Sequence, residues 1–304
     1  MATMDTESAG NFSRKPDHGQ FRELLDMIKF EHTVFALPFA FLAVLAASPT
    51  LPSWWTLGWI LAAMVGARTA AMTFNRLVDA DLDAENPRTQ DRALPAGRVS
   101  RNGAMLLLGG SIVLFGFAAG MLGPLPWQLA PLALVIILGY SLCKRFTSLA
   151  HAVLGLALAG APLGAWIAVT GHLDPPAWYL ALGVLTWTAG FDVLYALQDE
   201  QFDKARGLRS IPARLGTTGA LWVSRGFHLV ALSAWACFNY HLGCHIFPWM
   251  AWLCVAGILG REHWVVRGGR LDRIDHVFFT LNSLVGPLFF LGHLIEWALG
   301  QGLT

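Results

Sequence analysis

Asn75-Arg76-Leu77-Val78-Asp79-Ala80-Asp81-Leu82-Asp83 is a polar stretch that ends a long apolar run. Because Asn75, Asp79 and Asp83 are spaced by four, a helix would present them in a row along one face. A carboxylate near the centre of a bilayer costs roughly 2.5 to 3.5 kcal/mol on the more lenient insertion scale, so a cluster there usually faces partners, water or metal. The stretch therefore predicts a helical span whose end carries a polar site.

A second acidic stretch lies further along the chain. Asp199 and Asp203 are four apart, and Asp192 and Tyr195 precede them at steps of three and four. One helix face would carry these side chains together and extend the polar surface deeper into the membrane. The second stretch therefore predicts a second oxygen-rich helix end.

The segments that follow the two acidic stretches are also alike. Arg92-Ala-Leu-Pro95-Ala precedes Gly103-Ala104, and Arg209-Ser-Ile-Pro212-Ala precedes Gly219-Ala220. A weak internal repeat of this kind indicates a pseudo-symmetric bundle with a site between its halves.

The composition is that of an integral membrane protein. Of 304 residues, 55% are hydrophobic and only 13% are charged, and the mean hydropathy is +0.50, so the chain has less polar surface than a soluble globule of this size. The net charge of +1 comes without a basic block, which excludes a nucleic-acid-binding protein. The four cysteines show no CxxC pairing, and we expect ordinary small thiols.

The apolar runs predict an all-α protein with nine transmembrane helices, because a spanning helix needs about 20 mostly apolar residues. The nine runs cover residues 24–47, 54–77, 102–120, 126–143, 148–170, 177–198, 218–237, 246–266 and 276–299. We expect residues 1–20 to form a disordered cytosolic tail and residues 21–304 to form a single transmembrane domain.

The distribution of Lys and Arg predicts the orientation. The loops after the first, third, fifth and seventh runs contain none of the 21 basic residues, and neither does the C-terminus. The positive-inside rule then places the other loops and the N-terminus in the cytoplasm and the C-terminus outside.

The ligand types in the two acidic stretches suit Mg²⁺. This ion prefers hard oxygen ligands and is often shared between one or two carboxylates and a substrate phosphate. Either stretch alone would be typical of a solvated helix face, but both occupy matching positions at the cytoplasmic ends of long apolar runs. The sequence therefore predicts a metal site whose candidate ligands are Asn75, Asp79, Asp83, Asp199 and Asp203.

Basic residues surround these carboxylates. Carboxylates, a divalent metal and Arg or Lys together form the usual clamp for a diphosphate, because guanidinium binds phosphate in a bidentate manner and lysine acts as a point charge. Arg68 lies inside the second run and needs an anionic partner there. The candidate diphosphate-binding residues are Lys29, Arg68, Arg76, Tyr140, Lys144 and Arg209.

The two acidic stretches resemble the signature motifs of the UbiA superfamily of intramembrane aromatic prenyltransferases. They read Asn75-Arg76-x-x-Asp79-x-x-x-Asp83 and Asp192-x-x-Tyr195-Ala196-x-x-Asp199-x-x-x-Asp203. The resemblance implies a nine-helix bundle with a cytoplasmic cap that binds Mg²⁺ and a polyprenyl diphosphate, and a lateral opening to lipid for the prenyl tail.

The resemblance also implies roles for individual residues. Asn75, Asp79 and Asp83 would hold one Mg²⁺, and Asp199 and Asp203 would hold another. Lys29, Arg68 and Lys144 match basic positions that resemble the family's diphosphate contacts. Asp192 and Tyr195 would be catalytic and would face the reacting end of the prenyl chain and the aromatic acceptor.

The acceptor remains open between two aromatic acids. The run from Lys29 to Pro38 and the run Tyr195-Ala196-Leu197-Gln198-Asp199 resemble a subgroup often labelled 4-hydroxybenzoate polyprenyltransferase. This subgroup also includes enzymes that prenylate a dihydroxynaphthoate in the futalosine route to menaquinone. The resemblance implies quinone biosynthesis in a bacterial inner membrane, with 4-hydroxybenzoate as the default acceptor and 1,4-dihydroxy-6-naphthoate as the alternative.

A secondary transporter for an anionic metabolite is the alternative from another class of protein, because half-repeats and intramembrane charges occur there too. Transporter sites lie near the membrane midplane at broken helices, whereas these carboxylates gather at one face beside long loops. The position of the acidic stretches therefore favours the enzyme.

Overall fold

The computed structural model describes residues 23–24, 27, 35–48, 50–267, 274 and 280–300. Lys29 and the predicted tail, residues 1–20, lie outside this part of the chain. The described part consists of helices joined by turns and loops, and it contains no strand. Its helices are α2 (Leu37–Ala47), α3 (Trp54–Glu85), α4 (Arg101–Leu122), α5 (Pro124–Cys143), α6 (Ala150–Thr170), α7 (Pro175–Tyr195), the 3-10 helix η2 (Ala196–Asp199), α8 (Glu200–Ala205), α9 (Ile211–His241), α10 (Ile246–Val265) and α12 (Asn282–Ala298).

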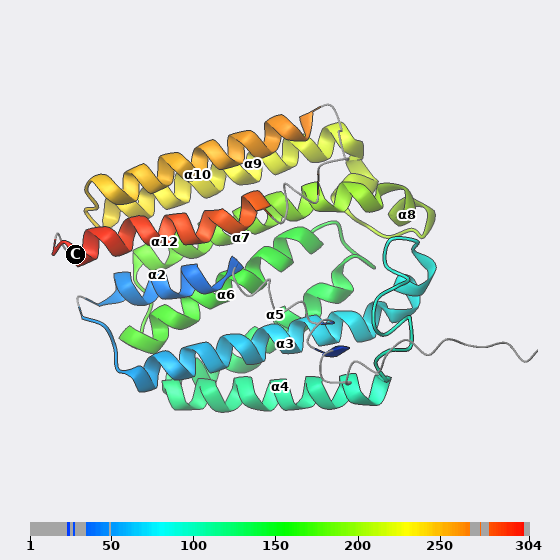
Figure 1. The fold of residues 1–304 in the computed structure, drawn as a ribbon, viewed down its shortest axis with the longest axis horizontal. Helices are drawn as coiled ribbons and strands as arrows, with labels where there is room; N and C mark the ends of the chain where they lie inside the picture. The colour runs from blue at the N-terminus through cyan, green and yellow to red at the C-terminus, as the bar shows by residue number, and fades with distance from the viewer. Residues whose placement is uncertain are drawn as a thin grey trace, which may run out of the picture.

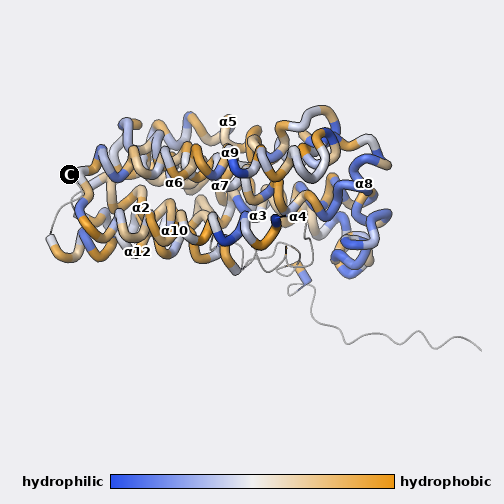
Figure 2. Tube along the Cα trace, turned by 90° about the horizontal axis from the view of Figure 1, so that it is seen from above, coloured by the Kyte–Doolittle hydropathy of each residue, from blue (hydrophilic) through white to orange (hydrophobic). Residues whose placement is uncertain are grey.

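The long helices lie side by side as one elongated bundle (Figure 1). Figure 2 shows that hydrophilic residues gather at the end that contains α8, whereas the rest of the bundle is mostly apolar. We call this end the polar end. The C-terminal end of α12 lies at the opposite end of the bundle. The fold therefore places the acidic stretches together at one end of an apolar bundle, as the sequence predicts.

Membrane-spanning helices are present, as predicted. Among the described residues, six helices are long and apolar enough to cross a membrane: α3, α4, α5, α6, α7 with its extension to Ala205, and α9. The apolar helix α2 is shorter, and α10 and α12 occupy the last two predicted runs. The total of nine crossings and the orientation stay predictions.

Serine caps begin the two helices that enter the bundle from the polar end after the acidic stretches. The Ser100 hydroxyl accepts a hydrogen bond from the backbone N–H of Gly103 at the start of α4. The Ser210 hydroxyl accepts one from Ala213 at the start of α9. Such a cap contributes about 1 kcal/mol. Both helices therefore have a serine N-cap, although Ser100 and Ser210 do not occupy corresponding positions of the internal repeat, in which Ser210 aligns with Ala93.

Helix α9 begins at Ile211, before the predicted run that starts at residue 218. A kink separates its first turn from the rest of the helix. Gly216 has φ 67° and ψ 176°, which are not helical. A residue with a side chain rarely adopts this positive φ, so the glycine permits the bend. The apolar run marks only the part of α9 beyond the kink.

Helix α7 is the central helix of the bundle, with 78% of its apolar window buried. It packs against α6 and α9, and glycines allow the close approach. A Cβ atom on Gly183 would lie 2.1 Å from Trp235 Nε1, and one on Gly190 would lie 2.3 Å from the His228 ring. Small residues at helix contacts are typical of membrane bundles. Because α7 also carries Asp192 and Tyr195, this packing positions part of the candidate site.

Candidate functional site

The first acidic stretch lies within α3, which continues to Glu85, beyond the predicted end of the run at residue 77. The helix therefore holds Asn75, Asp79 and Asp83 on one face, as predicted. The amide of Asn75 donates a hydrogen bond to Asp79 Oδ2 at 3.0 Å. The Asn75 carbonyl oxygen accepts one from Arg76 Nη1 at 3.3 Å. Hydrogen bonds within the protein therefore hold the Asn75 and Asp79 side chains in place.

Arginines from nearby loops neutralise the first stretch. Arg92 Nη1 contacts both carboxylate oxygens of Asp83 at 2.7 Å. Arg145 Nη2 lies 3.4 Å from Asp79 Oδ1. By contrast, Asp81 points away from the site, since its side chain is 90% exposed and pairs with Arg101. The exposure of Asp81 agrees with a four-residue spacing that selects one face of α3.

The second stretch differs from the prediction of one continuous helix face. Helix α7 ends at Tyr195, and the chain passes through the 3-10 helix before α8 begins. A 3-10 helix has 3.0 residues per turn instead of 3.6, so the direction of the side chains changes there. Asp199 and Asp203 are nonetheless both buried. In the described part of the chain, Asp203 Oδ2 has no hydrogen-bond partner.

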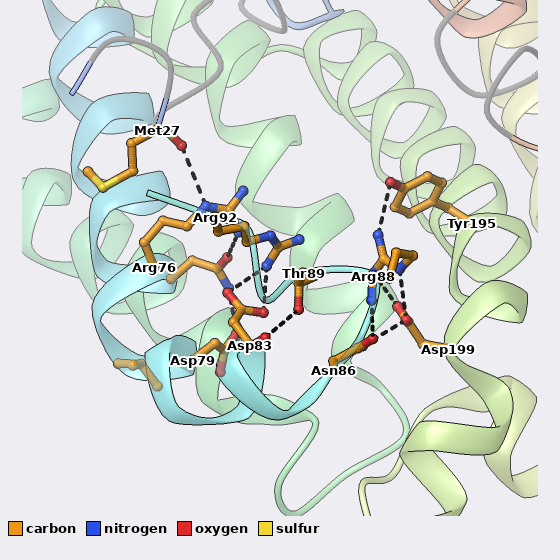
Figure 3. A network of polar contacts seen from close by, with 12 residues as sticks. Met27, Arg76, Asp79, Asp83, Asn86, Arg88, Thr89, Arg92, Tyr195 and Asp199 are labelled. Carbon is orange, nitrogen blue, oxygen red and sulfur yellow. Dashed lines mark hydrogen bonds and ion pairs between the residues drawn. The ribbon is translucent and has the colours of Figure 1, made fainter. Parts of the chain in front are cut away.

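The loop after α3 connects the two stretches (Figure 3). Arg88 donates from Nε to Asp199 Oδ1 at 2.9 Å and from Nη2 to Asp199 Oδ2 at 2.5 Å. Arg88 Nη1 also donates to the Tyr195 hydroxyl at 3.3 Å, and the Asn86 amide donates to Asp199 Oδ1 at 3.2 Å. Charge-assisted bidentate pairs of this kind are strong and geometrically specific. The first half of the repeat thus holds the carboxylate of the second half.

Burial lowers the pKa of Arg88, but the hydrogen bonds and the charge of Asp199 outweigh it, so the pKa of the guanidinium lies above its ordinary value. Arg88 therefore stays charged at any physiological pH. The sequence shows Arg88 only as one of several basic residues near the carboxylates. The pairing joins residues 111 positions apart, and no local spacing could have identified it.

Predicted diphosphate-binding residues gather between the two stretches. Lys144, which follows α5, interacts electrostatically with Asp79, Asp199 and Asp203. Tyr140, one turn earlier on α5, interacts electrostatically with Arg68 and Arg76. The structure therefore brings Lys144, Tyr140 and the two α3 arginines together around the carboxylates.

Among the described residues, Arg209 contacts backbone carbonyl oxygens and not the carboxylates. Its Nη1 donates to the Phe146 carbonyl oxygen at 2.8 Å, and its backbone N–H donates to the Lys144 carbonyl oxygen at 2.7 Å. Arg209 thus joins the start of α9 to the loop after α5. These contacts hold the segment that carries Lys144, and binding of diphosphate by Arg209 stays a prediction.

A second contact of the site was also not predicted. His151 on α6 is fully buried, and its Nδ1 lies 2.7 Å from Asp192 Oδ2. His151 Nε2 accepts a hydrogen bond from the backbone N–H of Ile211 at 3.4 Å. The sequence gives no signal for this contact, since a lone His in an apolar run is compatible with many roles.

The residues present fit a divalent metal with oxygen ligands. Five carboxylate or amide side chains come from α3, η2 and α8, and one of their oxygens, Asp203 Oδ2, is buried without a hydrogen-bond partner in the described residues. Hard oxygens in this number suit Mg²⁺. The described residues contain no group of three or more His, Cys, Asp or Glu side chains already arranged to hold a metal, so the fit lies in the donor types.

An apolar helical bundle whose polar end joins carboxylates to Arg and Lys fits a membrane enzyme that acts on a phosphorylated substrate. The sequence pattern of the UbiA prenyltransferase family matches residues 36–284, so the chain belongs to this family. Two similar proteins are 4-hydroxybenzoate octaprenyltransferases. The one from Polaromonas sp. is 32% identical over 84% of this chain and 88% of its own length. The one from Tolumonas auensis is 30% identical over 83% and 88%.

Solved structures agree with this assignment. The apo structure of a UbiA homolog from Aeropyrum pernix K1 has a TM-score of 0.80 and 31% identity, and the match covers 88% of this chain and 98% of that one. A UbiA homolog from Archaeoglobus fulgidus, solved with DMAPP and Mg²⁺, has a TM-score of 0.73 at 18% identity, over 91% and 99% of the two chains. The predicted UbiA-type fold and the predicted enzyme class, an aromatic polyprenyltransferase, are confirmed by these comparisons taken together.

Proposed function

We propose that this protein transfers a polyprenyl group from a polyprenyl diphosphate to 4-hydroxybenzoate in quinone biosynthesis. The observation that carries the proposal is the joining of two oxygen-rich stretches by Arg88 at the polar end of an apolar bundle. Relatives at 30% and 32% identity that are named 4-hydroxybenzoate octaprenyltransferase support both the donor class and the acceptor.

Asn75, Asp79, Asp83, Asp199 and Asp203 are the proposed ligands of Mg²⁺. The A. fulgidus structure with DMAPP and Mg²⁺ supports the choice of metal. When bound, Mg²⁺ would supply Lewis-acid stabilisation of the charge that develops on the leaving diphosphate. We place one ion on the α3 ligands and a second on Asp199 and Asp203.

Arg68, Arg76 and Lys144 are the proposed contacts of the diphosphate. Arg68 and Arg76 lie on α3 near Tyr140, and Lys144 lies near carboxylates of both stretches. Fixed positive groups next to the leaving group stabilise its negative charge without reorganisation during the reaction. The bond between the allylic carbon of the donor and the diphosphate oxygen breaks, and the electron pair leaves with the diphosphate.

Asp192 and Tyr195 are the proposed catalytic residues at the acceptor. Both lie near the end of α7, and the Tyr195 hydroxyl accepts a hydrogen bond from Arg88. The allylic cation forms a bond with a ring carbon ortho to the acceptor hydroxyl, and that carbon then loses its proton. The surrounding apolar helices exclude water, which would otherwise capture the cation.

The proposed topology has nine crossings with the N-terminus inside. The basic loops at the polar end support it, because the positive-inside rule assigns such loops to the cytoplasm. The proposed location is a bacterial inner membrane with the site on its cytoplasmic side. Labelling of cysteines introduced at Thr50 and at Asn102 by an impermeant reagent tests it, since opposite accessibility of the two positions is expected.

The test of the function is a direct assay. Membranes that contain the protein are incubated with a polyprenyl diphosphate, Mg²⁺ and 4-hydroxybenzoate, and products are identified by mass spectrometry. A prenylated hydroxybenzoate is expected. Product from 1,4-dihydroxy-6-naphthoate alone would replace the acceptor with the alternative that the sequence leaves open, and no product from any phenolic acid would contradict the proposal.

A further inference from the structure

The contact between His151 and Asp192 joins three helices at the candidate site. His151 lies in the first turn of α6, Asp192 lies in the last turn of α7, and Ile211 begins α9. The His151 side chain has no exposed surface, whereas the side chain of Asp192 is 22% exposed. The imidazole is therefore buried behind a carboxylate that is itself open to the site.

The hydrogen bonds of His151 define its tautomer. The backbone N–H of Ile211 points at Nε2, so Nε2 must carry a lone pair and cannot carry a proton. Nδ1 then carries the only ring proton of a neutral imidazole and donates it in the 2.7 Å hydrogen bond to Asp192 Oδ2. The N–H of Ile211 is one of the donors that the first turn of a helix leaves without a partner in the helix. The backbone of α9 thus fixes the imidazole, and the imidazole fixes the carboxylate.

We propose that His151 is a positioning residue that holds Asp192 in its working orientation. This inference rests on the proposed function. One oxygen of Asp192 is occupied by His151 Nδ1–H, so the exposed part of the carboxylate faces the acceptor and accepts a hydrogen bond from its phenolic hydroxyl. That hydrogen bond increases electron density on the ring carbon that attacks the prenyl cation. His151 itself touches neither substrate, because it has no exposed surface.

A matched pair of substitutions separates this role from a purely structural one. In His151→Asn, the side-chain amide takes about the place of Nδ1 and can still donate to Asp192, but it does not reach Ile211. In His151→Gln, the amide takes about the place of Nε2 and can still accept from Ile211, but it does not reach Asp192. A positioning role requires the contact between residue 151 and Asp192. A role as a tether between α6 and α9 requires the contact with Ile211 instead.

The measured quantities are kcat and the KM for each substrate. We expect His151→Gln to lower kcat about 10- to 100-fold, the range for loss of one hydrogen bond to a charged group, with little change in KM for the prenyl diphosphate. His151→Asn should stay within about threefold of the wild-type kcat on the same reasoning. In an Asp192→Ala background, His151→Gln should cause no further loss. Equal kcat values for the two variants, or a lower kcat for His151→Asn, would overturn the inference.

A second readout does not depend on turnover. Nitrogen-15 NMR of histidine-labelled protein, with the His151 signals assigned by their absence from His151→Asn, should show a neutral ring protonated at Nδ1. A ring protonated at Nε2 or at both nitrogens would overturn the inference even if the enzyme is active. Absence of product from the wild-type enzyme with any acceptor would instead overturn the proposed function and leave the NMR result to decide the hydrogen bonding.

Discussion

The two acidic stretches share a four-residue spacing, but their backbone conformations differ. The first lies on one uninterrupted helix, α3, and its Asp83 is paired with Arg92 of the loop that follows it. The second crosses from an α-helix through a 3-10 helix, and its Asp199 is paired with Arg88, which belongs to the first half. The loop after α3 therefore serves both stretches, so the repeat is symmetric in sequence and asymmetric in its contacts.

Removal of divalent metal should have the largest effect, because both stretches are proposed to hold it. We expect EDTA to abolish turnover and Mg²⁺ in excess to restore it, since the charge on the leaving diphosphate would otherwise lack its main stabilisation. Product formation by mass spectrometry measures both steps. Full activity in EDTA would contradict the metal assignment for both stretches at once.

Asp79→Ala should lower kcat by about 10²-fold or more, because it removes one proposed ligand and one fixed charge. The matched control is Asp81→Ala, since Asp81 is on the same helix but points away and is exposed. That control should keep wild-type kinetics. If both variants lose activity equally, the effect comes from α3 as a whole and not from the face that carries Asp79.

Arg88→Lys tests the connection between the two halves. Lysine keeps the positive charge but cannot donate from two positions to one carboxylate, so Asp199 and Tyr195 would lose their fixed partner. We expect kcat to fall about 10-fold, in line with loss of a hydrogen bond to a charged group. Arg98→Lys, which changes an exposed pair with Glu23, is the control and should leave kcat unchanged. Wild-type kcat in Arg88→Lys would show that charge alone is sufficient there.

We expect the smallest effect from Gly190→Ala. This substitution disturbs the packing of α7, the helix that carries Asp192 and Tyr195 of the second stretch. The added Cβ would lie 2.3 Å from the buried His228 ring, so the ring or the helix that carries it must shift, at a cost of about 1–3 kcal/mol. Thermal unfolding in detergent measures the loss. Gly164→Ala is the control, because nothing lies within 4 Å of the added atom; it should be neutral or slightly stabilising. Equal unfolding temperatures for the two variants would argue against close packing at Gly190.

Periodicity and local spacing predict much of this molecule. The apolar runs locate the helices, and the four-residue step in α3 correctly places Asp79 and Asp83 on one face, with Asp81 excluded. The same step fails after Tyr195, because a change from α to 3-10 geometry depends on how the chain must turn toward α8. The spacing of residues in the sequence carries no information about that turn.

Contacts between distant segments are the part that a single sequence could not supply. The pairing of Arg88 with Asp199 and the pairing of His151 with Asp192 join residues 111 and 41 positions apart. Each depends on how helices are arranged around α7, and that arrangement follows from side-chain shape, such as the fit of Trp235 against Gly183. Residue types identified the chemistry of the site, whereas packing determined the partners.

The three arginine partners of Asp79, Asp83 and Asp199 have a consequence for how the site is filled. Each of these three carboxylates already has a counter-charge, so these three ion pairs are electroneutral before any ligand arrives. A bare diphosphate or a bare metal ion would upset that balance, whereas the two arriving together would not. Affinity for each should therefore rise in the presence of the other, by the same factor. Calorimetric titrations with each alone and with both present would detect this coupling, and independent binding would show that the arginines do not set the charge balance.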